Sequence, residues 1–347
     1  MKKKEIAKLI LFPLILCGSI LGLNFGLFQK VSDDLNSYSH FYKEQENSLD
    51  VVLMGNSTIR EGYIPTQMWK EYGITSRGFS SSPTHPEVIY LAIDEVIRVQ
   101  HPDIVFIDLT GLTYQKRIDA DFFVAQYYKA LPEGEHKDKV KEAHPFLNDQ
   151  KDKFELFKNH NNFRQQQYWE SLVYPDQFKT KGYQPNKIIS AVKPVELEDD
   201  KLLPLNEDGE YYFEKIMEKC REYQENTRFI FGKMPKYNDI LGGEAFRECE
   251  YMFRTIEERL KDTDFGYMNF SNVLEEIGLN PKTDFKDNDH LNHLGAIKFT
   301  HYYGQYLLDN SLKIKNKTEE VKNDFDEAYL KTKDYLDGIT KKLTKKI

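Results

Sequence analysis

The chain has 347 residues and a formal net charge of −8, from 48 Lys and Arg against 56 Asp and Glu. This length accommodates one large α/β domain together with an anchor and insertions. The acidic balance argues against a nucleic-acid partner, because phosphate contacts need clustered Lys and Arg on the binding face.

The N-terminus has the pattern of a membrane anchor. An apolar stretch runs from Leu9 to Phe28, close to the ~20 residues that span a bilayer, and four lysines precede it: Lys2, Lys3, Lys4 and Lys8. The pattern predicts an uncleaved transmembrane helix within residues 1–30, a cytoplasmic N-terminus and an extracytoplasmic remainder. A cleaved signal peptide is the alternative, although no A-x-A-like site follows the apolar stretch. We expect a helical linker over residues 31–48.

Strands and helices alternate from Leu49 onward. The run Leu49–Met54 is short, continuous and β-branched, which is typical of a buried parallel strand. Further elements are predicted in this order: a helix over Pro65–Tyr72 ended by Gly73, a strand over Thr75–Ser82, a helix over Pro86–Val99 and a strand over Asp103–Leu109.

Residues 112–205 interrupt this alternation with a polar and aromatic segment, which we interpret as a helical cap insertion over the site. The alternation returns with helices near Gly209–Asn226 and Gly243–Lys261, strands over Arg228–Gly232 and Gly266–Phe270, and a last helix over Asn292–Leu308. This pattern predicts an α/β fold with a doubly wound parallel sheet and right-handed crossovers, in a domain over residues 49–310.

The tail over residues 311–347 predicts an amphipathic helix from Thr318, with a basic end that contains Lys341, Lys342, Lys345 and Lys346. We expect this helix to pack on its own domain, and binding to a membrane surface or a partner is the alternative. The three cysteines, Cys17, Cys220 and Cys249, follow no metal or disulfide-framework spacing, so no metal and no cofactor is implied. One Cys220–Cys249 disulfide is the alternative to two buried thiols.

Two motifs carry candidate chemistry. Ser57 follows the first strand, where ligands bind in a doubly wound sheet. A serine needs a base to take its proton, and His290 can supply one. Asp287 precedes His290 by three residues, so one turn can bring its carboxylate to the other ring nitrogen. Asp289 is the competing acid, but as the direct neighbour of His290 it is expected to point elsewhere.

The motifs resemble those of the SGNH (GDSL-like) hydrolase superfamily. Within it, the chain is similar to the membrane-anchored bacterial branch of DltD-like teichoic-acid D-alanylation proteins and alginate O-acetylation proteins. The resemblance is carried by Val51–Thr58, Lys181–Tyr183, Ile230–Pro235 and Thr283–Thr300. It implies a flavodoxin-like three-layer sandwich.

The resemblance also implies residue roles. Ser57 would be the nucleophile, His290 the general base and Asp287 the acid that orients it, with the Ser57 amide as one oxyanion donor. Ser80 stands where the second block of the family has a glycine. The third block reads Leu109-Thr110-Gly111-Leu112 and lacks the family's asparagine, so Asn56 or Thr110 would replace that donor.

The function implied is an extracytoplasmic O-acyltransferase that moves an acetyl or D-alanyl group onto a cell-envelope polysaccharide or teichoic acid through an acyl-serine. Such proteins act with a multipass membrane O-acyltransferase (MBOAT-type). One alternative is an esterase that hydrolyses an ester on a glycan or lipid. The other is a non-catalytic assembly or binding protein on the same scaffold.

Overall fold

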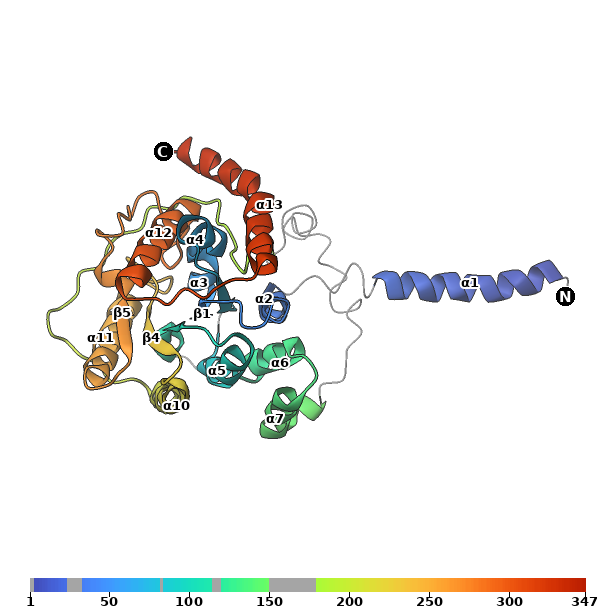
Figure 1. The fold of residues 1–347 in the computed structure, drawn as a ribbon, viewed down its shortest axis with the longest axis horizontal. Helices are drawn as coiled ribbons and strands as arrows, with labels where there is room; N and C mark the ends of the chain where they lie inside the picture. Colours follow the sequence, from blue (N-terminus) through green and yellow to red (C-terminus); the bar gives the residue numbers. More distant parts are fainter. Residues whose placement is uncertain (1–2, 24–32, 82–83, 114–119, 150–178) are drawn as a thin grey trace.

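The computed structural model describes residues 3–23, 33–81, 84–113, 120–149 and 179–347 (Figure 1). A five-stranded parallel sheet lies at its centre, in the order β2-β1-β3-β4-β5. The strands are β1 (Val51–Gly55), β2 (Ser76–Ser80), β3 (Ile104–Asp108), β4 (Arg228–Lys233) and β5 (Gly266–Asn269). This is a doubly wound order, so the predicted α/β fold with a doubly wound parallel sheet is confirmed.

Side chains of β1 alternate between two hydrophobic cores. Val52 and Met54 belong to one core, and Val51 and Leu53 belong to the other. The first core is covered by α5 (Pro86–Gln100), α10 (Glu207–Tyr223) and α11 (Gly243–Leu260), and the second by α3 (Ser57–Gly62), α4 (Pro65–Tyr72) and α12 (His293–Asp309). Figure 1 shows α4 and α12 on the opposite side of the sheet from α5 and α10.

Local signals set several helix boundaries. Pro65 begins α4 and Gly73, at φ 67°, ends it in the left-handed conformation that glycine adopts without strain. Pro86 begins α5, where the His85 side chain accepts a hydrogen bond from the Glu87 amide. The predicted bounds of α4 are confirmed, and α5 ends one residue later than predicted.

The described part of the insertion does two different things. Its first part contains η3 (Leu109–Thr113), α6 (Ala120–Ala130), α7 (Glu135–Ala143) and η4 (Pro145–Asp149). Helix α6 packs against α2 (Asp33–Phe41) and α5, so it extends the α5 layer instead of covering the carboxyl ends of the strands. Its last part, the 180–193 segment, lies against the candidate site.

The N-terminal helix α1 (Lys3–Gly22) projects from the rest of the molecule (Figure 1). It carries exposed apolar side chains, including Phe12 and Leu14. The predicted span from Leu9 to Phe28 continues past α1 into residues outside the described ones. Within the part of the chain that the structure describes, no helix combines the length and apolarity needed to cross a membrane, so the predicted anchor is not confirmed.

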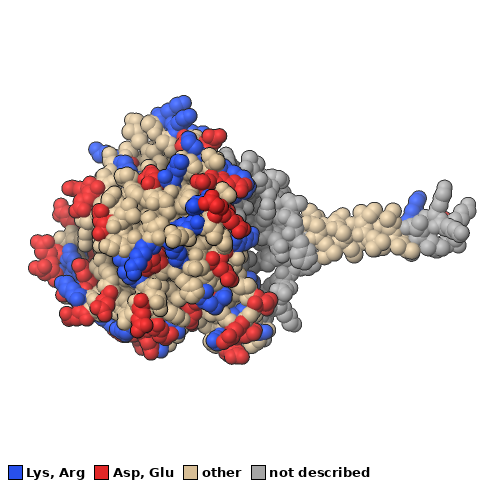
Figure 2. Space-filling view, in the orientation of Figure 1, with Lys and Arg blue, Asp and Glu red and all other residues tan. Residues whose placement is uncertain are grey.

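The tail forms α13 (Glu319–Thr344), which packs on α4 and α12. Val321 and Phe325 are buried, and the Trp69 indole N–H donates to Asp326 at 2.9 Å. The predicted amphipathic helix and its packing on its own domain are therefore confirmed. Figure 2 shows both signs of charge interspersed over the face in view.

Candidate active site

The turn after β1 presents Ser57 at the carboxyl edge of the sheet. Asn56 caps α3, because its Oδ1 accepts hydrogen bonds from the Thr58 amide at 2.8 Å and the Thr58 hydroxyl at 2.6 Å. The helix therefore begins at Ser57. As a first-turn group, the Ser57 amide has no carbonyl partner within the helix.

A compact loop over residues 285–292, here called the acid–base loop, holds the other two predicted residues. Its ends pair through an antiparallel bridge between Phe285 and Leu291, and the Lys286 amide donates to the His290 carbonyl at 2.9 Å. Asn292 then caps α12 by accepting from the Leu294 amide at 2.9 Å. The loop is thus fixed at both ends.

Ser57, His290 and Asp287 form a continuous hydrogen-bonded chain. Ser57 Oγ lies 2.7 Å from His290 Nε2, and His290 Nδ1 lies 2.9 Å from Asp287 Oδ1. The side chains of His290 and Asp287 are 13% and 27% exposed, and Ser57 is 9% exposed. This is the geometry in which an imidazole takes a proton from a hydroxyl while a carboxylate fixes the tautomer.

Asp287 is held in its ionised form. Burial alone would raise its pKa, but the hydrogen bond and charge of His290, the Asp289 amide and the Lys286 ammonium outweigh burial and lower the pKa of Asp287 to about 2. The same Oδ1 also accepts the amides of Asp289 at 2.8 Å and His290 at 2.9 Å. A carboxylate at this position would stabilise an imidazolium at His290.

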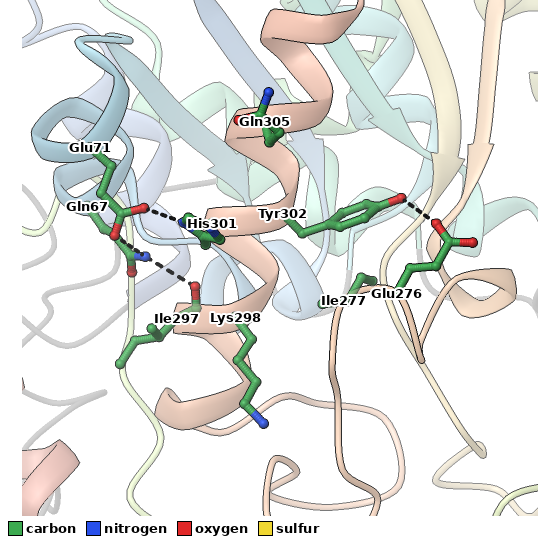
Figure 3. Close-up of a pocket in the computed structure, with 9 residues that line it drawn as sticks. All are labelled: Gln67, Glu71, Glu276, Ile277, Ile297, Lys298, His301, Tyr302 and Gln305. Carbon is green, nitrogen blue, oxygen red and sulfur yellow. Dashed lines mark hydrogen bonds and ion pairs between the residues drawn. The ribbon is translucent and has the colours of Figure 1, made fainter.

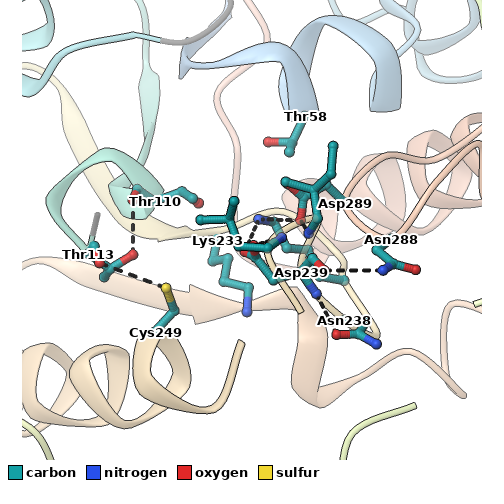
Figure 4. Close-up of polar contacts among 12 residues, drawn as sticks. Thr58, Thr110, Thr113, Lys233, Asn238, Asp239, Cys249, Asn288 and Asp289 are labelled. Carbon is teal, nitrogen blue, oxygen red and sulfur yellow. Dashed lines mark hydrogen bonds and ion pairs between the residues drawn. The ribbon is translucent and has the colours of Figure 1, made fainter. Parts of the chain in front are cut away.

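Asp289, the competing acid, contacts a neighbouring loop that contains Asp239 (Figure 4). Its Oδ1 accepts from Lys236 Nζ at 3.1 Å and from the Ile240 amide at 3.2 Å. Asn288 Nδ2 also reaches that loop, donating to the Asp239 carbonyl at 3.2 Å. Asp289 therefore anchors the 236–240 loop to the acid–base loop.

The proposed oxyanion residues occupy three different environments. The Asn56 oxygen is used by the helix cap, so its amide nitrogen is the group left to donate. Ser80 is fully buried at the end of β2, and its Oγ has no hydrogen-bond partner among the described residues. Thr110 is 1% exposed and its amide donates to Asp108 Oδ1 at 2.7 Å. Its amide is therefore in use, but its hydroxyl, the side-chain donor that the sequence suggested, has no hydrogen-bond partner among the described residues.

Asp108, at the end of β3, was not predicted from the sequence. It is 1% exposed, and its Oδ2 accepts from the Thr58 hydroxyl at 3.1 Å while Oδ1 holds Thr110. Its Cβ lies where a side chain at Gly55 would stand, at 2.7 Å from an ideal Cβ. Gly55 thus allows Asp108 to approach the turn that carries Ser57. An acidic residue ending an apolar strand was the available sequence signal.

A buried lysine lies beneath this edge of the sheet, inside the Ile230–Pro235 motif (Figure 4). Lys233 is 1% exposed, forms an ion pair with Glu250 and lies 4.5 Å from the centre of the Phe246 ring. Burial, together with repulsion from Lys236, lowers the pKa of Lys233 to about 7. Because the Lys233 side chain is buried and paired with Glu250, we interpret it as a structural residue that supports the end of β4.

The Lys181–Tyr183 motif explains how the insertion returns to the domain. Lys181 is fully buried, where it pairs with Glu44 at 2.8 Å and with Asp324 of α13. Gly182, at φ 92°, turns the chain there. The Tyr183 hydroxyl then lies 2.7 Å from Nδ1 of His293, the first residue of α12. This motif starts the 180–193 segment beside the acid–base loop.

An open groove of about 470 Å³ lies between α4, α12 and the loop that carries Glu276 and Ile277 (Figure 3). None of the three triad residues lines it. Its polar side chains engage one another, with Glu71 2.9 Å from His301 and the Tyr302 hydroxyl 3.3 Å from Glu276. We therefore place the candidate site at Ser57 and not in this groove.

The described residues contain no group of three or more His, Cys, Asp or Glu side chains placed to hold a metal ion. Cys17, Cys220 and Cys249 are free thiols, so the alternative disulfide is not formed. Burial raises the pKa of Cys220 well above its ordinary value, which makes this thiol unreactive.

No protein-family model and no curated protein matches this chain. Several solved structures are similar to it. Three of them are a candidate acylhydrolase from Bacteroides fragilis (13% identity, 80% of this chain and 96% of that chain, TM-score 0.40), a GDSL-like lipase from Bacteroides thetaiotaomicron (14%, 80% and 99%, 0.39) and a family 3 carbohydrate esterase from Clostridium thermocellum (11%, 76% and 96%, 0.36). All three TM-scores lie below 0.5, so the chemistry of the site is taken from this chain's own geometry.

Proposed function

We propose that this protein is a serine-dependent enzyme that forms an acyl ester on Ser57. The observation that carries the proposal is the hydrogen-bonded chain from Ser57 Oγ through His290 to Asp287, at 2.7 and 2.9 Å. Ser57 and His290, which make the first of these contacts, lie 233 positions apart in the chain. A turn or a helix cap alone does not require such an arrangement.

The chemistry proceeds in two halves. Ser57 Oγ attacks the carbonyl carbon of an ester while its proton passes to His290 Nε2, and the imidazolium is stabilised by Asp287. His290 then returns the proton to the leaving alcohol, which leaves the acyl group on Ser57. In the second half, water or an acceptor hydroxyl loses its proton to His290 and attacks the acyl-serine. The bond between the acyl carbon and Ser57 Oγ then breaks, and His290 returns the proton to Ser57 Oγ.

Two donors lie at the Ser57 turn itself for the oxyanion in this proposal. The Ser57 amide is a first-turn donor of α3, and the Asn56 amide nitrogen is the side-chain donor next to it. In a well-studied serine protease, removal of one such donor weakens transition-state stabilisation by ~2.7–4 kcal/mol. Asn56 is also the α3 cap, so replacing it would affect both the helix and the oxyanion.

We further propose transfer to a cell-envelope polymer as the physiological reaction. The support is the resemblance of Val51–Thr58 and Thr283–Thr300 to the membrane-anchored acylation branch. In this proposal the domain lies outside a membrane, and a multipass O-acyltransferase (MBOAT-type) supplies an acetyl or D-alanyl group. The acceptor would be a polysaccharide or a teichoic acid.

Product analysis tests both levels of the proposal. Full-length protein is incubated with an activated acetyl ester, with and without an oligosaccharide acceptor, beside a Ser57→Ala control. We expect ester cleavage that Ser57→Ala abolishes, and acetylated oligosaccharide when the acceptor is present. Free acid as the sole product would support the esterase alternative over transfer. Unchanged turnover in Ser57→Ala would exclude catalysis by this serine.

A further inference from the structure

Beyond the three triad residues, one ion-paired cluster connects the nucleophile helix to the acid–base loop. Its members are Glu61 of α3, Lys286 of the acid–base loop and Asn186 of the 180–193 segment. We propose that this cluster, centred on the Glu61–Lys286 ion pair, positions Ser57 against His290 and Asp287. The inference rests on the proposed function.

Glu61 lies on the same side of α3 as Ser57. It follows Ser57 by four residues, and side chains at this spacing are neighbours on a helix surface. Its side chain is only 8% exposed. A carboxylate this buried needs a cation or several hydrogen bonds, since an isolated buried charge is strongly unfavourable.

Lys286 supplies that cation and contacts both halves of the triad. Its Nζ lies 3.1 and 3.3 Å from the two Glu61 oxygens and 3.7 Å from Asp287 Oδ2. Asp287 Oδ1 is used by His290 and two backbone amides, so Lys286 faces the oxygen that those bonds leave open. One ammonium thus bridges a carboxylate of the nucleophile helix and the carboxylate that orients the base.

Asn186 adds a neutral connection to the same carboxylate. Its Nδ2 donates to Glu61 Oε2, and its carbonyl accepts from the His293 amide at 3.1 Å, at the start of α12. Next to it, the Gln184 amide donates to the Arg60 carbonyl at 2.8 Å. The 180–193 segment therefore binds the end of α3 and the element that follows His290.

These contacts have a geometric consequence for the reaction. The 2.7 Å contact between Ser57 and His290 joins two elements that come from opposite ends of the domain sequence. Among the described residues, Glu61, Lys286 and Asn186 also connect these two elements, which are α3 and the acid–base loop. A displacement near 1 Å at a reacting group can reduce a rate by about 100-fold.

The test compares variants that change the cluster with one that breaks a similar ion pair elsewhere. Lys286→Gln and Glu61→Gln remove one charge each, and Lys286→Arg keeps the cation. The matched control is Lys298→Gln. Lys298 pairs with the buried Asp284 at 2.7 Å and contacts no triad residue. Each full-length variant is titrated with a fluorophosphonate to count competent Ser57 sites, and kcat and KM per site are measured with a chromogenic acetyl ester.

We expect Lys286→Gln and Glu61→Gln to lower kcat per site by about 10- to 100-fold with little change in KM. Lys286→Arg should recover most of kcat. The variant that combines Lys286→Gln with Glu61→Gln should have a kcat no lower than that of the slower single variant, because both changes act through one ion pair. Lys298→Gln should lower the melting temperature but leave kcat per site unchanged.

A wild-type kcat per competent site in Lys286→Gln and Glu61→Gln, with only the melting temperature lowered, would overturn the inference and show a purely structural pair. Equal losses of kcat in Lys298→Gln would overturn it as well. If Ser57→Ala kept full turnover and the wild type took up no fluorophosphonate, the proposed function would fail instead. The two failures are therefore distinguishable.

Discussion

Close packing around Gly55, two residues before Ser57, predicts a sharp effect for Gly55→Ala. A Cβ at Gly55 would stand 2.7 Å from Asp108 Cβ and 2.7 Å from Ile59 Cδ1. Carbon atoms in contact normally lie ~3.5–4.0 Å apart, so the overlap is about 1 Å on two sides. Ile59 can rotate its terminal methyl, but the Asp108 Cβ belongs to β3 and cannot move independently.

The strain should reach Ser57 through Asp108. Asp108 holds the Thr58 hydroxyl and the Thr110 amide, so moving it disturbs the turn that carries the nucleophile. Overpacking of a rigid core typically destabilises by ~1–3 kcal/mol. We expect the free energy of unfolding to fall by that amount and kcat to fall by about 100-fold, as a shift near 1 Å at a reacting group can produce.

Urea unfolding and steady-state turnover of an acetyl ester measure the two effects. The matched control is Gly338→Ala in α13, where a Cβ meets no atom within 4 Å. That change should stabilise the helix by about 0.5–1 kcal/mol and leave kcat unchanged. A Gly55→Ala protein with wild-type stability and turnover would refute the reasoning from close packing at the nucleophile turn.

Three further predictions concern Asp287 and Lys181. Asp287→Asn should lower kcat by about 10⁴-fold, because the amide favours the wrong imidazole tautomer, and a loss below tenfold in steady-state assays would contradict this role. The pKa of Asp287, about 2 against an ordinary 3.8, adds stability above pH ~4 that is lost as pH falls toward 2. After allowance for its partial exposure the contribution is about 1 kcal/mol. Urea unfolding of wild type and Asp287→Asn should therefore converge over that pH range, and parallel curves would oppose it. Lys181→Met should destabilise by about 1–3 kcal/mol, because the buried Glu44 would lose one of its two cations and keep Arg77, and a melting temperature equal to that of the wild type would contradict it.

The elements with strong local signals could be predicted from the sequence. The apolar runs before Gly55 and after Pro102 gave β1 and β3, because a strand buried on both faces needs continuous apolar residues. Pro65 and Gly73 predicted the first and last residues of α4. The triad contacts followed from the rule that strand ends gather at one edge of the sheet, together with the three-residue step from Asp287 to His290.

Other contacts between distant segments could not be predicted. Glu61 and Lys286 lie 225 positions apart, and nothing in either local sequence indicates the other. The hydrogen bond of the Thr110 amide could not be predicted either, because it depends on the conformation of the Asp108 side chain. The first part of the insertion was predicted to cover the site, but α6 packs on α2 and α5, where its buried face meets apolar side chains.

Trapping of the acyl-enzyme tests the central claim most directly. Full-length protein is mixed with an activated acetyl ester, quenched in acid within the first turnover and digested for peptide mass spectrometry, beside Ser57→Ala and His290→Ala. The account predicts an acetyl group on Ser57 in the wild type, none at that position in Ser57→Ala, and strongly slowed acylation in His290→Ala. Ester turnover without acetyl-Ser57, or an acetyl group that forms equally fast without His290, would contradict it.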